Sequence, residues 1–383
     1  MAAKTSLQVE VFSRLADVGQ EAWDGCAGQG NPFVSYAFLS ALEESGSIGE
    51  GTGWYPRYLG LREEGGELSV VLPCYAKTHS YGEYVFDHGW ANAFEQAGGR
   101  YYPKLQVAVP FSPVPGPRLL SRGADVAQSA LALEILVEAF SCSSAHVTFC
   151  TEAEWHRLGE AGWLQRLGLQ FHWENRGYRH FDDFLEDLSS RKRKTIRRER
   201  REAQAGLTFK VLHGTEITRA VWARFYEFYL STIERKWGGA YLTPEFFPLL
   251  GERLGNKVVL MLAERHGKPI AGALNLRGDG VLYGRNWGCT EDVPFLHFEL
   301  CYYQAIEYAI AHGLQRVEAG AQGEHKIQRG YLPQPTYSAH FIVHPGLRKA
   351  VARFLEGERQ SILSTIAALT QEGPYKTQPG QGA

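Results

Sequence analysis

The sequence predicts a mixed α/β protein made of two successive units with the same order of elements. In each half of the 383 residues, two strand-like runs flank a polar turn, and a long helix with apolar residues at helical spacing follows, then a short strand. Hairpins that alternate with long helices favour a mixed, mostly antiparallel sheet with helices on its faces. A chain of 383 residues also suits two domains of ordinary size.

Each half opens with a strand and helical segments that precede the hairpin. The first half is expected to contain a strand at 7–13, a helix at 38–45, a hairpin at 55–77 around a turn at 63–66, an aromatic run at 81–91, a helix at about 124–140 and a strand at 146–150. The second is expected to contain a strand at 207–214, a helix at 218–237, a hairpin at 257–278 around a turn at 265–268, an aromatic run at 282–289, a helix within 295–313 and a strand at 315–320. The strand-like run at 171–173 gives way to polar residues, which predicts domains at 1–176 and 177–383.

The composition excludes several classes of protein. The chain is 44% hydrophobic and 21% charged, which is typical of a globular protein. Its apolar runs fall short of the roughly 20 residues that a membrane-spanning helix needs, and its N-terminus has no secretory signal. The six cysteines lie apart without a CxxC pair, as buried thiols do in a reducing compartment. We therefore expect a cytoplasmic protein without a membrane span, a disulfide framework or a zinc knuckle.

Residues 191–201 carry eight cations and one glutamate, although the formal net charge of the chain is only −2. On a helix, Ile196, Ala203 and Leu207 share one stripe and the cations cover the rest of the circumference. Like charges four residues apart weaken the helix, which favours a site for an anionic partner over a solvated face. The partner would be the phosphates of a nucleotide or tRNA, or an anionic glycan precursor. The predicted anion-binding residues are Arg191, Lys192, Arg193, Lys194, Arg197 and Arg198.

Residues 98–120 contain five prolines, which forbid a central strand across the second half of this stretch. One interpretation is a strand that opens in mid-sheet and offers backbone groups to a ligand, with Lys104 and Arg118 at its two ends and Tyr102 beside them. The other is a proline-stiffened loop whose aromatic side chains fill the core. The sequence leaves these two interpretations equal.

Residues 320–330 read GAQGEHKIQRG and directly follow a predicted strand, where ligands of open α/β sheets usually lie. The glycines allow a close backbone approach, and Lys326 and Arg329 supply cations. Glu318, Glu324 and His325 are the titratable groups that could move a proton. No metal is expected because no ligand spacing resembles a known metal motif, and the stretch matches neither a Walker loop nor a GxSxG elbow. A simple strand-to-helix turn with surface charges is the remaining interpretation.

Five strings of the chain resemble one known family. They are FDHGWANAF, GGRYYPKLQVAVPFSPVPGPRLL, SSRKRKTIRRERR, NWGCTEDVPFLHFELCYYQAIEYAI and EAGAQGEHKIQRGYLP, and together they look like the Fem-type peptidoglycan biosynthesis/recognition group of the GNAT acyltransferase superfamily. The resemblance implies two tandem GNAT-like domains and transfer of an acyl or aminoacyl group from acyl-CoA or aminoacyl-tRNA to an amine. GCTEDVPFLHFE does not match the glycine-rich loop with which GNAT enzymes bind acetyl-CoA.

From these residues and the resemblance together, we expect roles for residues of both halves. In the second half, Glu318, Glu324 or His325 would accept the proton of the amine. Other residues there would line the pocket or hold anions of the substrates, namely Arg285, Trp287, Lys326 and Arg329. In the first half, the acceptor, an amine-bearing small molecule or cell-wall precursor, would be bound by Asp87, His88, Tyr102, Lys104 and Arg118. The alternative is a non-catalytic protein that recognises a glycan, a peptide or a nucleic acid.

Overall fold

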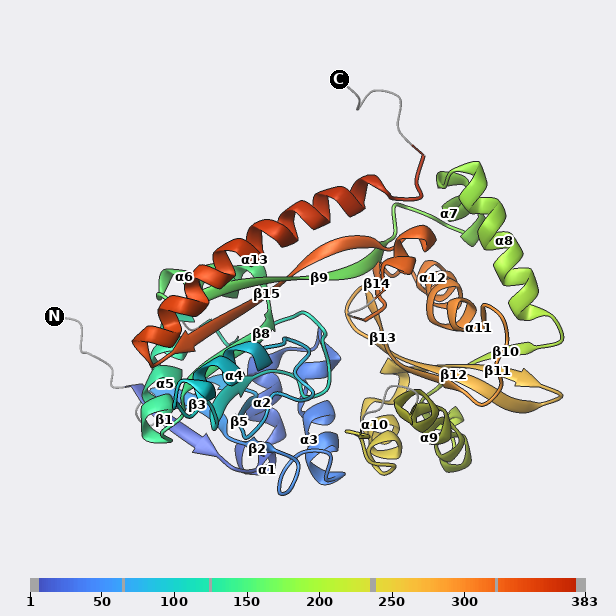
Figure 1. The fold of residues 1–383 in the computed structure, drawn as a ribbon. Helices are drawn as coiled ribbons and strands as arrows, with labels where there is room; N and C mark the ends of the chain where they lie inside the picture. The colour runs from blue at the N-terminus through green and yellow to red at the C-terminus, as the bar shows by residue number, and fades with distance from the viewer. Residues whose placement is uncertain (1–6, 64–65, 124–125, 235–238, 321–322, 377–383) are drawn as a thin grey trace. The chain divides into compact units, whose positions relative to one another are not determined.

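A computed structural model describes residues 7–63, 66–123, 126–234, 239–320 and 323–376 (Figure 1). Contacts within the chain divide it into two compact units. Unit 1 comprises Met1–Gly168, Tyr241–Phe246 and Pro335–Ser364, and unit 2 comprises Leu169–Ala240, Phe247–Gln334 and Thr365–Ala383. The chain first passes from unit 1 to unit 2 after residue 168, close to the boundary expected after residue 176, and it later returns to unit 1.

Unit 1 contains two sheets with helices packed on them. Its strands are β1 (Leu7–Phe12), β2 (Trp54–Pro56), β3 (Tyr58–Glu63), β4 (Leu68–Leu72), β5 (Cys74–Lys77), β6 (Lys104–Val107), β7 (Leu120–Ser121) and β8 (Ser144–Cys150). Its helices are α1 (Leu15–Val18), α2 (Gln20–Ala27), η1 (Pro32–Val34), α3 (Tyr36–Glu44), α4 (His88–Gln96), α5 (Val126–Ala139) and α6 (Glu152–Glu160). Three long elements, β9 (Leu164–Glu174), β15 (Leu332–Ile342) and α13 (Pro345–Gln371), have residues in both units, and so does α10 (Phe246–Leu254) through its first residue.

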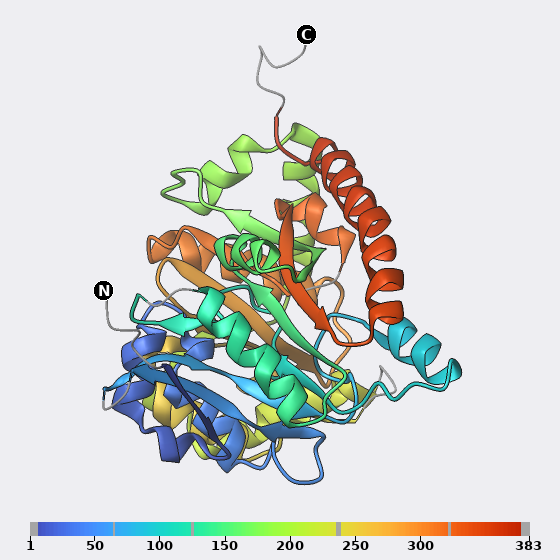
Figure 2. The same cartoon turned by 90° about the vertical axis from the view of Figure 1, so that its left-hand side faces the viewer.

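The strands of unit 1 are mostly antiparallel. One sheet has the order β1-β3-β4-β7, and in the other β15, β8, β6, β5 and β2 follow one another. Strands β6 and β8 are parallel, with Leu105 opposite Ala145. Helix α5 packs its buried Leu133 and Val137 on these strands (Figure 2). The expected order of strand, hairpin, long helix and strand is thus confirmed in this unit, although residues 64 and 65 of the predicted turn lie outside the described residues.

The two unusual stretches of unit 1 both form loops. The aromatic run at 81–91 is not a strand like residues 282–289, because residues 78–87 are irregular and α4 begins at His88. The proline-rich stretch follows the second of its two interpretations. Arg118 is fully buried and donates to the carbonyls of Thr148 and Val114, while the Gly116 N–H donates to the Phe149 carbonyl. The backbone groups beside β8 are therefore satisfied by the chain itself, and Arg118 stabilises the loop.

Unit 2 is built around one sheet with helices on both faces. Its remaining strands are β10 (Thr208–His213), β11 (Val258–Arg265), β12 (Lys268–Arg277), β13 (Val281–Cys289) and β14 (Arg316–Glu318). Its helices are α7 (Phe181–Asp187), α8 (Ser190–Gln204), η2 (Gly214–Glu216), α9 (Arg219–Glu234), α10 (Phe246–Leu254), η3 (Gly255–Lys257), α11 (Leu296–Phe298), the π-helical η4 (Glu299–Tyr303), α12 (Gln304–Ala311) and η5 (Glu324–Arg329). The strand order is β10-β11-β12-β13-β14-β9.

The sheet of unit 2 follows from its sequence. Strand β11, VVLMLAER, is a nearly continuous apolar run and is buried along both faces. It joins β12 through a two-residue turn in which His266 and Gly267 have φ of 51° and 75°, as a tight hairpin requires. Helices α11 and α12 lie on one side of the sheet and α9 and α10 on the other (Figure 1). The expected mixed α/β architecture with a mostly antiparallel sheet is confirmed.

No helix among the described residues is both long enough and apolar enough to span a membrane.

Candidate functional site

The parallel strands β13 and β14 of unit 2 separate after three residues. Their pairing ends where Tyr283 lies opposite Glu318, while β13 continues to Cys289. Gly284 follows the last paired residue of β13, and a Cβ added there would lie 3.3 Å from the Glu318 carbonyl oxygen. Beyond this point the register of β13 with β12 is also irregular, and Arg285 lies within that irregularity. The carboxyl ends of diverging parallel strands are the usual place for a ligand in an α/β sheet.

The helix that follows β13 brings aromatic and imidazole rings to this end of the sheet. Residues 296–311 are helical throughout and contain a π-helical turn in η4, a rare feature that is frequent at functional sites. Five residues, which we call the His325 cluster, pack side by side: Trp287, His297, Phe298, Tyr302 and His325. The ring centroids of Trp287 and His297 are 4.9 Å apart, and those of Phe298 and His325 are 5.6 Å apart.

His325 is held in place by its neighbours. The Tyr302 hydroxyl lies 2.9 Å from Nε2 of His325. The imidazole also rests against Gly323, where a Cβ would be 2.3 Å from the ring and where φ is +111°. Only glycine suits this backbone conformation and this close approach. The glycine at position 323 is therefore explained by the packing of the histidine ring. Residues 321 and 322 of the same loop lie outside the described residues.

The His325 imidazole is neutral at neutral pH. Partial burial lowers its pKa below the ordinary value of 6.5, and the cations Arg329 and Lys326 lower it further. Burial raises the pKa of the Tyr302 hydroxyl well above 10, so this group stays protonated. When His325 donates from Nε2 to the Tyr302 oxygen, its Nδ1 carries a lone pair. His325, while hydrogen-bonded to Tyr302, can then accept a proton at Nδ1.

The other predicted residues of this loop lie in different surroundings. Glu324 is exposed at the start of η5. Glu318 is buried in β14, with Oε1 3.6 Å from the Arg316 guanidinium and Oε2 4.0 Å from the His172 imidazole. Lys326 is also buried, and its ammonium donates to the Gly320 carbonyl at 2.9 Å. Of the three proton-acceptor candidates, His325 is the one that joins the ring cluster.

Arg329 faces inward toward helix α8. Its Nη2 donates to Glu199 Oε1 at 2.8 Å and its Nη1 donates to the His325 carbonyl at 2.7 Å. The guanidinium also lies 3.5 Å above the Phe298 ring. The guanidinium of Arg329 is therefore bound by groups of the protein itself. Sequence reasoning missed Glu199. The signal that could have found it is its spacing, about one helical turn after Ile196 and one before Ala203.

Helix α8 confirms the predicted basic helix. It begins at Ser190 after Ser189 as N-cap, so the first cations lie at the positive end of the helix dipole, where anions bind well. Ile196 and Ala203 are buried as predicted, whereas Leu207 lies beyond the end of the helix. Four of the predicted anion-binding residues are exposed, namely Arg191, Lys194, Arg197 and Arg198. The other two, Lys192 and Arg193, are half-buried.

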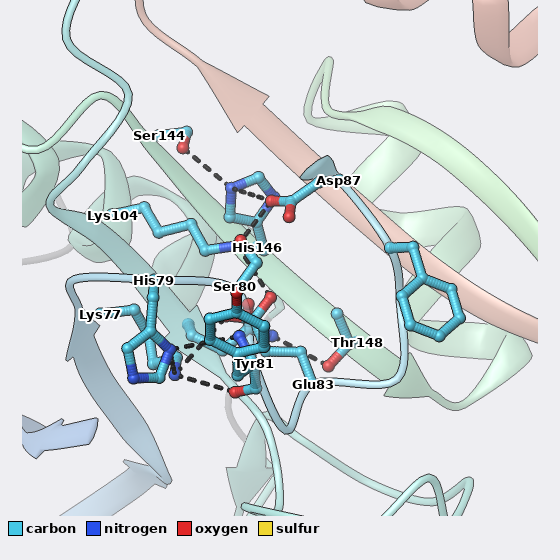
Figure 3. Close-up of polar contacts among 12 residues, drawn as sticks. Lys77, His79, Ser80, Tyr81, Glu83, Asp87, Lys104, Ser144, His146 and Thr148 are labelled. Carbon is cyan, nitrogen blue, oxygen red and sulfur yellow. Dashed lines mark hydrogen bonds and ion pairs between the residues drawn. The ribbon is translucent and has the colours of Figure 1, made fainter. Parts of the chain in front are cut away.

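Unit 1 contains a second concentration of polar groups, which we call the Lys104 network (Figure 3). It consists of Lys77, Ser80, Glu83, Asp87, Tyr101, Tyr102, Lys104, Ser144, His146 and His340. The Lys104 ammonium is fully buried and donates to Ser80 Oγ and Glu83 Oε2, each at 2.8 Å, and to Asp87 Oδ2. The Tyr102 hydroxyl joins through Ser80 Oγ at 2.9 Å. The predicted residues Asp87, Tyr102 and Lys104 are thus brought together.

Burial shifts the protonation of this network strongly. It lowers the pKa of Lys77 to about 7 and raises that of Glu83 to about 7, and the two groups lie 3.8 Å apart. Burial would also raise the pKa of Asp87, but the Lys104 ammonium holds it well below its usual range. The pKa of His146 falls to about 3 through burial and Lys104. Perturbed pKa values that cluster in this way are typical of functional sites and of structural ion networks alike.

Two histidines from paired strands complete the Lys104 network. His146 in β8 lies opposite His340 in β15, and their Nδ1 atoms are 2.7 Å apart, so one imidazole donates to the other. Ser144 Oγ lies 2.8 Å from the other nitrogen of His146. The sequence did not indicate the histidine pair, because His340 lies 194 residues from His146, and it did not indicate Lys77 or Glu83 either.

The loop above the Lys104 network turns its aromatic rings outward. Tyr81 and Phe86 are 60% and 61% exposed, and the ring of His88 lies 5.6 Å and 6.5 Å from theirs. The loop's polar residues Glu83 and Asp87 point inward to the lysines (Figure 3). A buried ionic network therefore supports an exposed aromatic surface. Rings presented in this way can stack on sugars or bases.

Among the described residues, no three His, Cys, Asp or Glu side chains come together as they would around a metal ion.

Comparison with known proteins gives one family and several similar folds. The family model FemAB-like, described as peptidoglycan biosynthesis/recognition, matches residues 14–377. No curated protein matches the chain. The crystal structure of FemX is similar with a TM-score of 0.52 and 12% identity, over 90% of this chain and 100% of that one. L-PGS from Bacillus licheniformis is similar with a TM-score of 0.51 and 11% identity, over 85% of this chain and 98% of that one.

A third similar structure is the C-terminal domain of a protein described as a lysylphosphatidylglycerol synthetase, from Agrobacterium fabrum. Its TM-score is 0.53 at 11% identity, over 88% of this chain and 95% of that one. At these identities the likeness is one of fold.

Proposed function

The chain belongs to the FemAB-like family of peptidoglycan biosynthesis/recognition proteins, and on this premise we propose that it is an acyltransferase that uses the His325 cluster. It transfers an aminoacyl or acyl group from a carrier to an amine. The observation that carries the proposal is the contact of 2.9 Å between the Tyr302 hydroxyl and His325 at the point where β13 and β14 separate. This contact holds a neutral imidazole at the usual position for a ligand.

The chemistry needs a proton acceptor and a positive charge. The nitrogen of the acceptor amine attacks the carbonyl carbon of the donor, and a C–N bond forms. His325 Nδ1 accepts the proton that the amine loses, and it returns this proton to the leaving oxygen of the donor ester as the C–O bond breaks. The buried ammonium of Lys326 stabilises the negative charge that develops on the carbonyl oxygen. Arg285 and Trp287, which lie in β13 beyond its pairing with β14, orient the donor.

The donor we propose is an aminoacyl-tRNA. Helix α8 presents a row of exposed cations that suits the phosphates of an RNA backbone. The segment GCTEDVPFLHFE, which runs from the end of β13 through α11, lacks the glycine-rich pattern that binds acetyl-CoA in GNAT enzymes. An acyl-CoA donor is the alternative that the experiment below separates.

The acceptor we propose is an amine of a peptidoglycan precursor, bound by the aromatic loop of unit 1. Tyr81, Phe86 and His88 offer ring faces that stack on a sugar or a base. Asp87 and Lys104 are buried beneath them and hold the loop in its shape. In this proposal these two residues support the acceptor surface from below.

A transfer assay tests the proposal. The protein is incubated with a radiolabelled aminoacyl-tRNA, or with a labelled acyl-CoA, together with a muropeptide that carries a free amine. We expect label to move from the tRNA to the muropeptide. Transfer from acyl-CoA alone would exclude the tRNA donor. Binding of the muropeptide without transfer from either donor would instead identify a non-catalytic recognition protein.

A further inference from the structure

Helix α8 has a carboxylate in the middle of its buried face. Ile196, Glu199 and Ala203 form that face, while the neighbouring cations are mostly exposed. An ionised carboxylate away from water is strongly unfavourable unless it is paired and hydrogen-bonded. An apolar residue would serve a purely structural stripe better. The partners of Glu199 therefore indicate what it does.

Both oxygens of Glu199 are bound by residues that end the elements of the proposed active site. Oε1 accepts from Nη2 of Arg329 at 2.8 Å, and Oε2 accepts from the Tyr303 hydroxyl. Tyr303 is the last residue of η4, and Arg329 is the last residue of η5. The carboxylate is thus tied to the segment that carries Tyr302 and to the segment that carries His325.

Arg329 extends this connection to the imidazole. Its Nη1 donates to the backbone carbonyl of His325 at 2.7 Å. Its guanidinium lies 3.5 Å above the ring of Phe298, and that ring packs against His325 with centroids 5.6 Å apart. One cation therefore contacts the carboxylate of α8, the backbone of His325 and a ring that limits how the imidazole can turn.

We propose that Glu199 is a positioning residue, which fixes the guanidinium of Arg329 and through it sets the orientation and the proton affinity of His325. The inference rests on the proposed function, in which His325 moves the proton. Its physical test needs no substrate, however, so the two can fail separately. The test varies the charge of Glu199. Removing the charge would shift the pKa of His325 if the charge acts on the imidazole, and would leave that pKa unchanged if Glu199 only anchors the helix.

The sign of the effect follows from the charges around His325. The groups that face the imidazole or lie beside it on its own element are the Tyr302 hydroxyl, the His297 imidazole, Glu324, Lys326 and Arg329. The cations among them disfavour the protonated ring, and Glu199 neutralises one of these cations. Removal of the Glu199 charge should lower the pKa of His325 further. Removal of the Arg329 charge should raise it.

An NMR titration of the full chain measures this pKa directly. The ring signal of His325 is identified by its absence in His325→Gln. Three variants are compared with the wild type: Glu199→Gln, Arg329→Met and, as the control, Glu299→Gln. Glu299 is also a buried acid that holds α8, but its hydrogen bonds go to Arg200, Gln204 and Gln304. It therefore tests loss of helix anchoring without loss of the Arg329 contact.

We expect the pKa of His325 to fall in Glu199→Gln, to rise in Arg329→Met and to stay at the wild-type value in Glu299→Gln. In the transfer assay, Glu199→Gln should lower kcat roughly tenfold and leave KM within about twofold, because substrate contacts are intact. An unchanged pKa in Glu199→Gln, or an equal change in Glu299→Gln, would overturn the proposal. If Glu199→Gln does not fold, Arg329→Met decides alone, and a pKa that does not rise refutes the link.

A wild-type protein that transfers nothing would count against the proposed function. The titration would still show whether Glu199 controls the imidazole.

Discussion

At the scale of single residues, the protein places ionisable side chains away from water in both units and pairs them. In unit 1, Lys104 binds the carboxyl groups of Glu83 and Asp87. Glu83 and its neighbour Lys77 both titrate near neutral pH because burial disfavours their charges. In unit 2, Glu199 binds Arg329 and Tyr303. Such pairs make stability depend on pH, since the unfolded chain binds protons at ordinary pKa values.

The raised pKa of Glu83 predicts how the variant Glu83→Gln responds to pH. Native Glu83 keeps its proton up to about pH 7, whereas the unfolded residue releases it near 4.5. Between these values the native state binds more protons, so the wild type loses stability as pH rises. Over this pH range the free energy of unfolding of Glu83→Gln should therefore rise relative to that of the wild type by on the order of 3 kcal/mol. Urea unfolding at a series of pH values from 4.5 to 7.5 measures the difference.

The control for this prediction is Glu67→Gln. The Glu67 side chain is 87% exposed and pairs with Arg122, so its difference from the wild type should stay constant to about 0.5 kcal/mol. A Glu83→Gln difference that stays flat across the same range, or that grows in favour of the wild type, would show that Glu83 is ionised in the native protein.

At the scale of elements, the sequence predicted the strand, hairpin, long helix and short strand of each half. It did not predict α6, α10 or α13, nor the contacts that give the elements a role. Apolar runs and turn residues are local signals, and they located β11, β12, α5, α8 and β14. The prolines after β6 could not reveal that Arg118 would satisfy the carbonyls around them, because that depends on β8, distant along the chain. The buried acid of α8 was equally hidden, since its partner Arg329 is 130 residues away.

Close packing of helix α9 on strand β13 predicts a strong effect of Gly288→Ala. An added Cβ would lie 1.7 Å from the Phe228 carbonyl oxygen, so either the helix or the strand must move. We expect a loss of more than about 2 kcal/mol in the free energy of unfolding, measured by urea denaturation. Gly89→Ala in α4 is the control, because its Cβ meets nothing within 4 Å. Equal stabilities of the two variants would mean that α9 does not lie against β13.

The outer face of α8 predicts a salt-dependent interaction with RNA. The double variant Arg191→Gln/Lys194→Gln removes two exposed cations from the first turns of the helix. Binding of an acceptor-stem RNA hairpin, followed by fluorescence anisotropy at several KCl concentrations, should weaken. The slope of log K against log salt should become less steep by about 1.5, which corresponds to two phosphate contacts.

Lys268→Gln is the matched control, since Lys268 is an exposed cation at the start of β12. If this variant and the double variant bind the hairpin with the same slope, α8 does not contact the phosphates.

At the scale of the whole molecule, the two units have similar sheets, but the surroundings of their parallel strands differ. Each has a parallel pair of strands, β6 with β8 and β13 with β14. In unit 1, Gly116 and Arg118 donate hydrogen bonds to backbone carbonyls of β8. In unit 2, the pairing of the parallel strands ends next to the His325 cluster. The order of elements led us to expect two successive domains, and the resemblance to Fem-type proteins predicted the fold. Which titratable group of the loop belongs to the site could not be read from spacing, because it depends on the side to which η5 turns each residue.

The central claim is that His325 accepts the proton of the amine during acyl transfer. The most direct measurement is the single-turnover rate of transfer from aminoacyl-tRNA at saturating acceptor, for the wild type, His325→Gln and the control His312→Gln, an exposed histidine at the end of α12. We predict a loss of about 100-fold or more for His325→Gln, with donor binding retained, and no loss for the control. Equal rates for His325→Gln and the wild type would contradict the claim.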